Sequence, residues 1–168
     1  MEAELKQDWL WALRRYLGVS ISLHFAWECL QLPLYTLWKT GSVRQQAYAV
    51  LHCTIGDIMI AALSLLVAFA VVGRAGWPIS GSRHVWLAAL FLGVGYTVYS
   101  EWLNVSVAGS WAYSPMMPTV PLIGTGLAPL LQWFVVPTLA LWFAIDHVPW
   151  RDRRRAKLPE KANGSGTE

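Results

Sequence analysis

The chain has 168 residues, of which 55% are hydrophobic and only 14% are charged. Because a water-soluble domain usually has about 25% charged residues, this chain has too little charge to cover an aqueous surface. Its apolar content excludes a disordered protein, and its two cysteines are too few for a disulfide-stapled secreted miniprotein. The composition therefore predicts one small, all-α integral membrane domain.

The first fifteen residues combine Trp9, Leu10, Trp11 and Leu13 with charged side chains. This mixture is typical of a short amphipathic helix that lies in the interface between a membrane and water. We therefore expect residues 1–15 to form an interfacial helix in contact with membrane lipids.

Four stretches meet the length requirement of a transmembrane helix, which is about 20 predominantly apolar residues. They cover roughly residues 16–37, 47–73, 84–105 and 120–145. The connection over residues 106–119 still contains Trp111 and Tyr113, so we expect it to fold back over the helix ends. The sequence thus predicts a polytopic membrane protein, with four transmembrane helices in an antiparallel bundle over residues 16–150.

Basic residues are distributed unequally between the predicted loops. If the N-terminus is cytoplasmic, eleven of the thirteen Lys and Arg lie on the cytoplasmic side, and only Lys39 and Arg44 lie opposite. By the positive-inside rule, we expect a multi-pass protein of the bacterial inner membrane with both termini in the cytoplasm. Residues 151–168 then form a basic, disordered cytoplasmic tail near anionic lipid headgroups. Nothing in this charge pattern indicates nucleic-acid binding.

Three acidic residues, Glu28, Asp57 and Glu101, lie inside predicted spans, where the sequence places no Lys or Arg to neutralise them. A carboxylate at membrane depth costs at least a few kcal/mol, so such groups usually face the bundle interior and mark a site or pathway. The helix rise of about 1.5 Å per residue places all three in the outer half of the membrane. They therefore predict one polar pocket that opens to the periplasmic side.

Helical spacing indicates which polar residues share a face. His24, Glu28 and Gln31 follow one another at intervals of four and three residues, and Thr97, Glu101 and Asn104 repeat this spacing on the third span. His52 lies five residues before Asp57, about 140° away around the helix, so it is not expected to point at Asp57. These considerations select eight candidate ligand-binding residues: Trp27, Gln31, His52, Thr97, Asn104, Trp111, Tyr113 and Gln132.

Several mechanisms could use this set of residues. In an enzyme acting on a hydrophobic small molecule, Glu28 and Asp57 would serve as acid and base, His24 would set the protonation of Glu28, and Glu101 would be an outer partner. In a carrier, the same acids would bind a proton or a cation. A third possibility is a metal or redox protein that uses His24 and His52 with an acid. A fourth is an accessory subunit of a larger membrane complex or a homo-oligomer.

We favour the first mechanism, without an assigned metal or cofactor. Cys29 and Cys53 fall at nearly the same depth on neighbouring predicted helices, so a disulfide between them is one alternative. We favour the other alternative, in which both are buried, inert thiols.

Three runs of sequence carry a resemblance to known proteins. HFAWECLQLPLY (24–35), HCTIGD (52–57) and the stretch from Tyr99 to Trp133 resemble an uncharacterised family of small four-helix bacterial inner-membrane proteins. That resemblance implies architecture alone. The HxxxE stripe on the first span, with an acid on each of the next two, is also similar to the EXPERA group, which includes sterol isomerases. This second resemblance implies a proton-transfer pocket for a sterol-like or terpenoid molecule.

Overall fold

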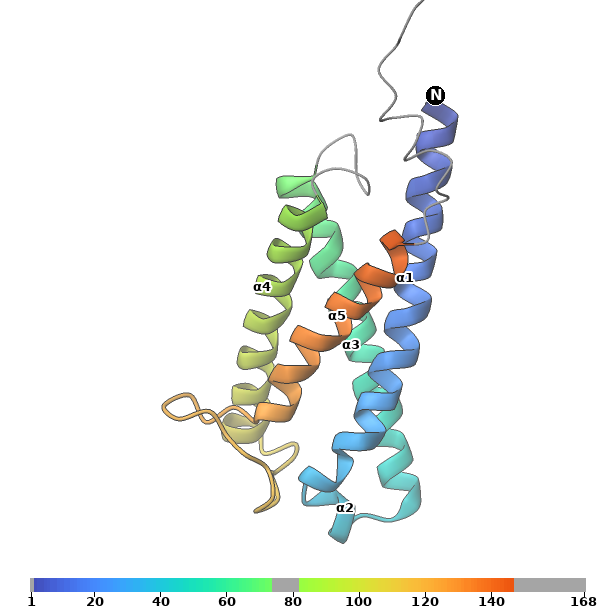
Figure 1. Ribbon diagram of the computed structural model, residues 1–168. Helices are drawn as coiled ribbons and strands as arrows, with labels where there is room; N and C mark the ends of the chain where they lie inside the picture. The colour runs from blue at the N-terminus through green and yellow to red at the C-terminus, as the bar shows by residue number, and fades with distance from the viewer. Residues whose placement is uncertain (1, 74–81, 147–168) are drawn as a thin grey trace, which may run out of the picture.

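The computed structural model describes residues 2–73 and 82–146, and its regular elements are all helical (Figure 1). The five α-helices of this part are α1 (Glu2–Gln31), α2 (Leu37–Thr40), α3 (Val43–Val72), α4 (Ser82–Glu101) and α5 (Leu127–Asp146). A 3-10 turn, η1 (Leu32–Leu34), follows α1, and a π-helical segment, η2 (Trp102–Val107), follows α4. The predicted all-α class is confirmed.

The four long helices pack around one another in a ring. α1 contacts α3 and α5, and α4 contacts the same two helices. α5 crosses the others obliquely, whereas α1, α3 and α4 run roughly along the long axis of the molecule (Figure 1). α1 and α5 therefore form the side of the bundle that lies opposite the α3/α4 pair.

Local sequence explains where two of these helices end and begin. α1 ends at Gln31 because Pro33 cannot donate the next helical hydrogen bond, and the chain tightens into η1. Ser42 caps the start of α3. Its Oγ accepts a hydrogen bond from the backbone N–H of Gln45 at 3.4 Å, and its own backbone N–H donates to the side-chain Oε1 of Gln45 at 2.9 Å. This reciprocal capping box fixes the register of α3 relative to the preceding loop.

Some helix ends differ from the predicted spans. α1 runs unbroken from Glu2, so residues 1–15 do not form a separate helix. The last helix begins at Leu127 rather than near residue 120, because residues 120–126 form turns in which Leu122 and Gly124 adopt positive φ angles of 74° and 69°. The predicted tail over residues 151–168 lies outside the described residues.

Two described helices are long and apolar enough to cross a membrane. They are α3 over Val43–Val72 and α5 over Leu127–Ala144. Only 22% of the apolar stretch of α3 is buried, whereas half of that of α5 is buried. α3 thus presents most of its apolar surface to the outside of the bundle.

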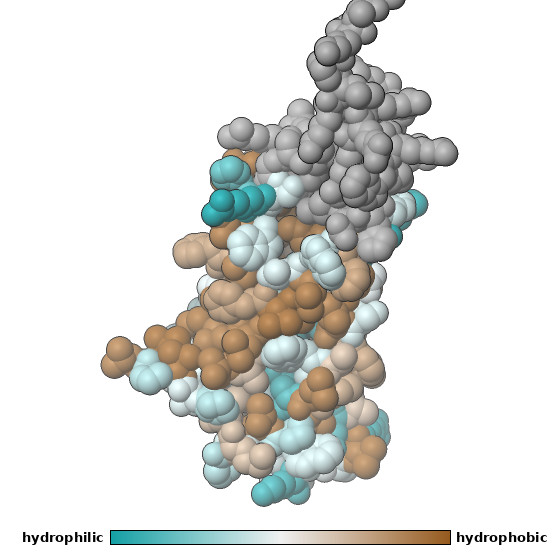
Figure 2. Space-filling model, in the orientation of Figure 1, coloured by the Kyte–Doolittle hydropathy of each residue, from teal (hydrophilic) through white to brown (hydrophobic). Residues whose placement is uncertain are grey.

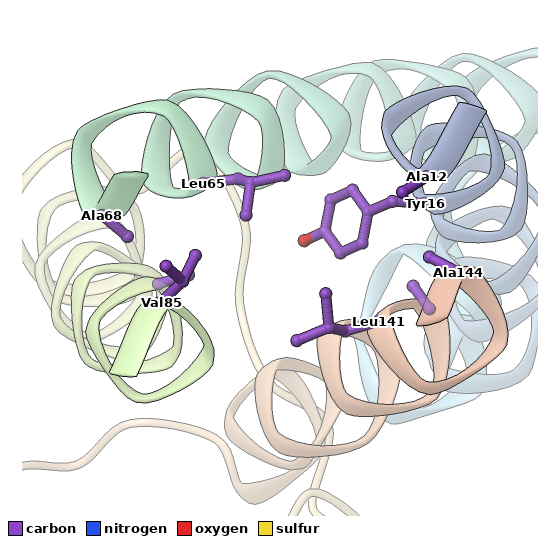
Figure 3. Packing of buried hydrophobic residues seen from close by; sticks show 9 residues of the cluster. Ala12, Tyr16, Leu65, Ala68, Val85, Leu141 and Ala144 are labelled. Atoms are coloured by element: carbon purple, nitrogen blue, oxygen red, sulfur yellow. The ribbon is translucent and has the colours of Figure 1, made fainter. Parts of the chain in front are cut away.

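The apolar core lies at the end of the bundle where α3 and α5 end and α4 begins. Figure 3 shows its side chains from close by, and most of them are small. Alanines allow helix backbones to approach closely, which closes this end of the bundle. The buried residues of this core are Ala12, Tyr16, Leu65, Ala68, Val85, Ala89, Ala140, Leu141 and Ala144.

A second close approach joins α4 to α5 beyond this core. Gly93 of α4 is buried, and a Cβ atom added to it would collide with the indole ring of Trp133, which is itself 1% exposed. Gly95, two residues further along α4, has open space at the same position. Gly93 therefore allows the Trp133 ring to pack directly against the backbone of α4.

We predict that Gly93→Ala lowers the free energy of unfolding by about 1–3 kcal/mol, because the Trp133 ring must move. The control is Gly95→Ala, which is expected to be neutral or to stabilise the helix by about 0.5–1 kcal/mol. Thermal unfolding of the two purified variants and the wild type checks this. Equal stability of the two variants would contradict the packing of Trp133 on Gly93.

Candidate functional site

A cluster of polar side chains occupies the bundle interior beyond the alanine-rich core. At its centre the Gln132 Nε2 atom of α5 lies 3.0 Å from His24 Nδ1, 3.1 Å from Glu28 Oε1 and 2.8 Å from Asp57 Oδ2. His24 and Glu28 come from α1, and Asp57 comes from α3. One amide group thus joins three ionisable side chains from two other helices.

Gln31 extends this cluster by one turn of α1. Its Nε2 atom donates to Glu28 Oε1 at 2.6 Å and to Gln132 Oε1 at 3.4 Å. His24, Glu28, Gln31 and Gln132 are all buried, and the Asp57 side chain is 15% exposed. Two amides therefore supply the hydrogen bonds that the buried Glu28 carboxyl group needs.

The amide hydrogens of Gln132 and Gln31 match the acceptor atoms of the cluster. The Gln132 amide nitrogen carries two hydrogens, yet three potential acceptor atoms surround it. Its two hydrogens can go to His24 Nδ1 and Asp57 Oδ2, because Gln31 Nε2 already donates to Glu28 Oε1 at 2.6 Å. The arrangement brings two carboxyl groups and an imidazole together around one amide, a geometry suited to proton exchange between them.

The charges of the cluster are not balanced by a fixed cation. Among the described residues, the one ion-pair contact of these acids is that of His24 Nδ1 with Asp57 Oδ2, at 3.5 Å. Helical spacing predicts that His24 acts on Glu28, one turn away, whereas its imidazole lies in ion-pair range of Asp57. Its other nitrogen, Nε2, is buried without a hydrogen-bond partner, and its ring lies 5.6 Å from that of Trp133.

Glu101 does not join this cluster. Its carboxyl group accepts a hydrogen bond from the Tyr113 hydroxyl, which in turn accepts one from the Gly126 N–H at 2.8 Å. Burial, followed by this contact with Glu101, raises the pKa of the Tyr113 hydroxyl, so it remains a proton donor at neutral pH. Tyr113 thereby ties the end of α4 to the start of α5.

The loop after η2 also binds η1 and the residues that follow it. The Thr36 N–H donates to the Ala112 carbonyl and the Ser114 N–H donates to the Leu34 carbonyl, each at 2.9 Å. The rings of Tyr35 and Tyr113 lie 5.6 Å apart. The expectation that this loop folds back over the helix ends is confirmed by these contacts.

A cavity of about 570 Å³ lies in front of the cluster. This volume falls within the range of about 300–1,000 Å³ that is typical of small-molecule sites. Its back wall includes Glu28, Gln31, Pro129, Gln132 and Trp133 from α1 and α5, and its sides come from α3 and α4.

Most of the predicted site residues meet at this cavity. Those that line it are Glu28, Gln31, His52, Asp57, Thr97, Glu101, Asn104, Trp111 and Gln132. His24 lies behind the carboxyl groups and does not line the cavity, and neither do Trp27 and Tyr113. His24 can therefore position or protonate the acids without touching a ligand.

The structure also bears on the alternatives of a metal site and of a disulfide. His52 is exposed and stacks on Tyr48 with ring centroids 5.6 Å apart, as expected for a side chain that does not point at Asp57. In residues 2–73 and 82–146, no group of three His, Cys, Asp or Glu side chains is arranged to hold a metal ion. Both cysteines are free thiols, and Cys29 is exposed rather than buried.

Trp133 is the main site residue that the sequence analysis missed. It lines the cavity, contacts the His24 ring and packs on Gly93. Its adjacency to Gln132 was the available signal, but a tryptophan in an apolar helix is usually interpreted as part of an interfacial belt. Tyr35, Tyr96 and Ser100 also line the cavity without having been predicted.

Searches with protein-family models, among curated proteins and among solved structures find no match to this chain.

We predict that Tyr113→Phe loosens the loop between η2 and α5, because it removes the donor to Glu101 and the acceptor for the Gly126 N–H. Hydrogen exchange at the Gly126 amide should become faster, by an amount equivalent to about 1–3 kcal/mol. Tyr99→Phe, at an exposed position of α4, is the control and should leave this exchange unchanged. Unaltered exchange at Gly126 in the Tyr113→Phe variant would show that the hydroxyl does not hold the loop.

Proposed function

We propose that the chain is an integral protein of the bacterial inner membrane and that α1, α3, α4 and α5 all span the bilayer. The distribution of side chains supports this. Large apolar residues cover the outside of the bundle, including Leu30, Val71 and Phe91, each at least 75% exposed. Polar side chains such as Gln132, Glu28 and Thr97 are buried inside. A water-soluble bundle has the opposite arrangement.

The surface pattern agrees with this placement. Apolar residues gather across the middle of the face seen in Figure 2, and hydrophilic residues gather near its lower end. A band of this kind suits the hydrocarbon layer of a bilayer, because a water-exposed apolar patch of this extent is rare in soluble monomers. The unequal distribution of Lys and Arg supports an orientation with both termini in the cytoplasm.

We predict that Ser42, in the loop before α3, faces the periplasm and that Arg83, at the start of α4, faces the cytoplasm. In a Cys29→Ser/Cys53→Ser background, Ser42→Cys should react with a membrane-impermeant maleimide in intact spheroplasts. Arg83→Cys should react only after the membrane is permeabilised. Equal labelling of both sites in intact spheroplasts would overturn the proposed orientation.

For function, we propose that the cavity binds a hydrophobic small molecule and carries out proton transfer on it. The observation that carries this proposal is the contact of one buried amide, that of Gln132, with His24, Glu28 and Asp57 at the back of the cavity. Two neighbouring carboxyl groups without a fixed cation can share one proton between them. A protonated acid beside an ionised one is the pair that general acid–base catalysis requires.

The residues would act as follows. A protonated carboxyl group, from Glu28 or Asp57, donates its proton to a double bond, and a new C–H bond forms. The other carboxylate removes a proton from a neighbouring carbon, so a C–H bond breaks and the double bond shifts. After the reaction, the second carboxyl group holds a proton and the first is ionised. His24, whose Nδ1 lies 3.5 Å from Asp57 Oδ2, returns this proton to the first carboxyl group and positions the acids without touching the substrate. The resemblance to the EXPERA group indicates the same class of isomerisation.

The closed end of the bundle favours a pocket over a transport path. Ala12, Ala68, Ala140 and Ala144 are fully buried beyond the polar cluster. The described residues of that core contain no ionisable side chain except the Tyr16 phenol. A proton- or cation-coupled carrier needs polar groups that lead to both sides of the membrane.

We predict that Glu28→Gln and Asp57→Asn each lower conversion of the bound molecule by about 10²–10⁴-fold, because each removes one half of the acid–base pair. Chromatographic separation followed by mass spectrometry of the small molecules that copurify with each variant measures the ratio of the two isomers, which have equal mass. Glu101→Gln, which alters an acid in the same cavity but outside the cluster, is the control and should have a much smaller effect. Identical bound species in the wild type and all three variants would refute the proposed chemistry.

A further inference from the structure

The cavity has a side opening between α3 and α4. Its back wall is buried, but six of its lining residues are exposed at the surface of the molecule. They belong to only these two helices: His52, Met59, Leu63 and Val67 on α3, and Leu92 and Tyr96 on α4. The cavity therefore reaches the outside through the side of the bundle rather than through its closed, alanine-rich end.

This opening is apolar and elongated. Asp57 and Val67 are ten residues apart on α3, which corresponds to about 15 Å along the helix. Met59, Ile60 and Leu63 line the cavity between them. An apolar slot thus leads from the polar cluster along α3 to a surface that we place in the hydrocarbon layer.

The polar end of the cavity selects against anions. Glu28, Asp57 and Glu101 line it, and none of the described lining residues is Lys or Arg. The Asp57 side chain lines this end and is 15% exposed, so its carboxyl group can accept a hydrogen bond from a ligand. A ligand head group that excludes water there needs a donor, because an unsatisfied buried acceptor costs about 1–3 kcal/mol.

From these observations we infer that the cavity takes a single-chain amphiphile from the bilayer, through the gap between α3 and α4. Its head group carries no negative charge and donates hydrogen bonds, as a long-chain alcohol or amine does. The head group lies against Gln31 and the carboxyl cluster, and the hydrocarbon chain lies along Met59, Leu63 and Val67. This inference rests on the proposed membrane placement and names the class of ligand for the proposed function.

The test uses three probes with the same hydrocarbon chain and a photoreactive diazirine near its end: a long-chain alcohol, an amine and a carboxylic acid. The protein is reconstituted in phosphatidylcholine and phosphatidylglycerol vesicles, irradiated, and its labelled peptides are identified by mass spectrometry. We expect the alcohol or the amine, but not the acid, to label α3 between Met59 and Val67 and α4 between Leu92 and Tyr96. Labelling by the alcohol alone or the amine alone identifies the head group.

A matched pair of glycine variants shows whether labelling depends on the cavity. Gly56 lines the cavity and Gly95 does not, and a side chain added at either position meets open space. Gly56→Leu should fill the cavity and lower labelling of α3 and α4 several-fold, whereas Gly95→Leu should leave it unchanged. Equal labelling by the acid, or labelling that Gly56→Leu does not reduce, would overturn the inference.

The outcomes also separate this inference from the proposed chemistry. Cavity-dependent labelling together with unchanged conversion in Glu28→Gln and Asp57→Asn would retain the lateral ligand site and reject proton transfer. Loss of conversion in these two variants, together with labelling that Gly56→Leu does not reduce, would retain the chemistry and reject entry between α3 and α4.

Discussion

The contact of the Gln132 amide with His24, Glu28 and Asp57 is the interaction on which the site depends. Two acids in the interior of a helical bundle would repel each other and would be costly to desolvate without partners. A neutral amide donates hydrogen bonds to both without adding a charge, as the proposed proton exchange between them requires. A lysine or arginine in the same place would fix both acids in their ionised form.

The two ends of the bundle differ in packing, and this difference creates the cavity. At one end Ala68, Ala140 and Ala144 bring the helices close together and leave no room for a ligand. Beyond this core the side chains are larger and polar, and Trp133 fills the space against Gly93 as the back wall of the cavity. The close-packed end therefore holds the helices in the positions that bring α1, α3 and α5 together around Gln132.

Much of the site could be predicted from helical spacing and depth. Glu28 and Asp57 stand out as acids without a basic partner in apolar stretches, and Gln132 is among the residues predicted to bind a ligand beside them. The same reasoning predicts that His52 does not point at Asp57, and in the structure His52 is exposed and stacks on Tyr48. These predictions succeed because an α-helix fixes the face and height of each side chain once its direction is known.

Other features could not be predicted because they depend on how helices rotate relative to one another and on loop conformation. Spacing places His24 on the face of Glu28, but the rotation of α1 directs its imidazole toward Asp57. The partner of Glu101 is Tyr113, in an irregular loop for which periodicity gives no information. The packing of Trp133 on Gly93 likewise joins residues forty positions apart in sequence.

The central claim is that Glu28 and Asp57 act as one unit through Gln132. A double-mutant cycle with Glu28→Gln and Asp57→Asn, measured as free energies of unfolding, tests it most directly. If the cluster is as described, the double variant departs from the sum of the single variants by about 0.5–3 kcal/mol, and this coupling disappears in a Gln132→Leu background. Additivity of the two single effects with Gln132 in place would contradict the account.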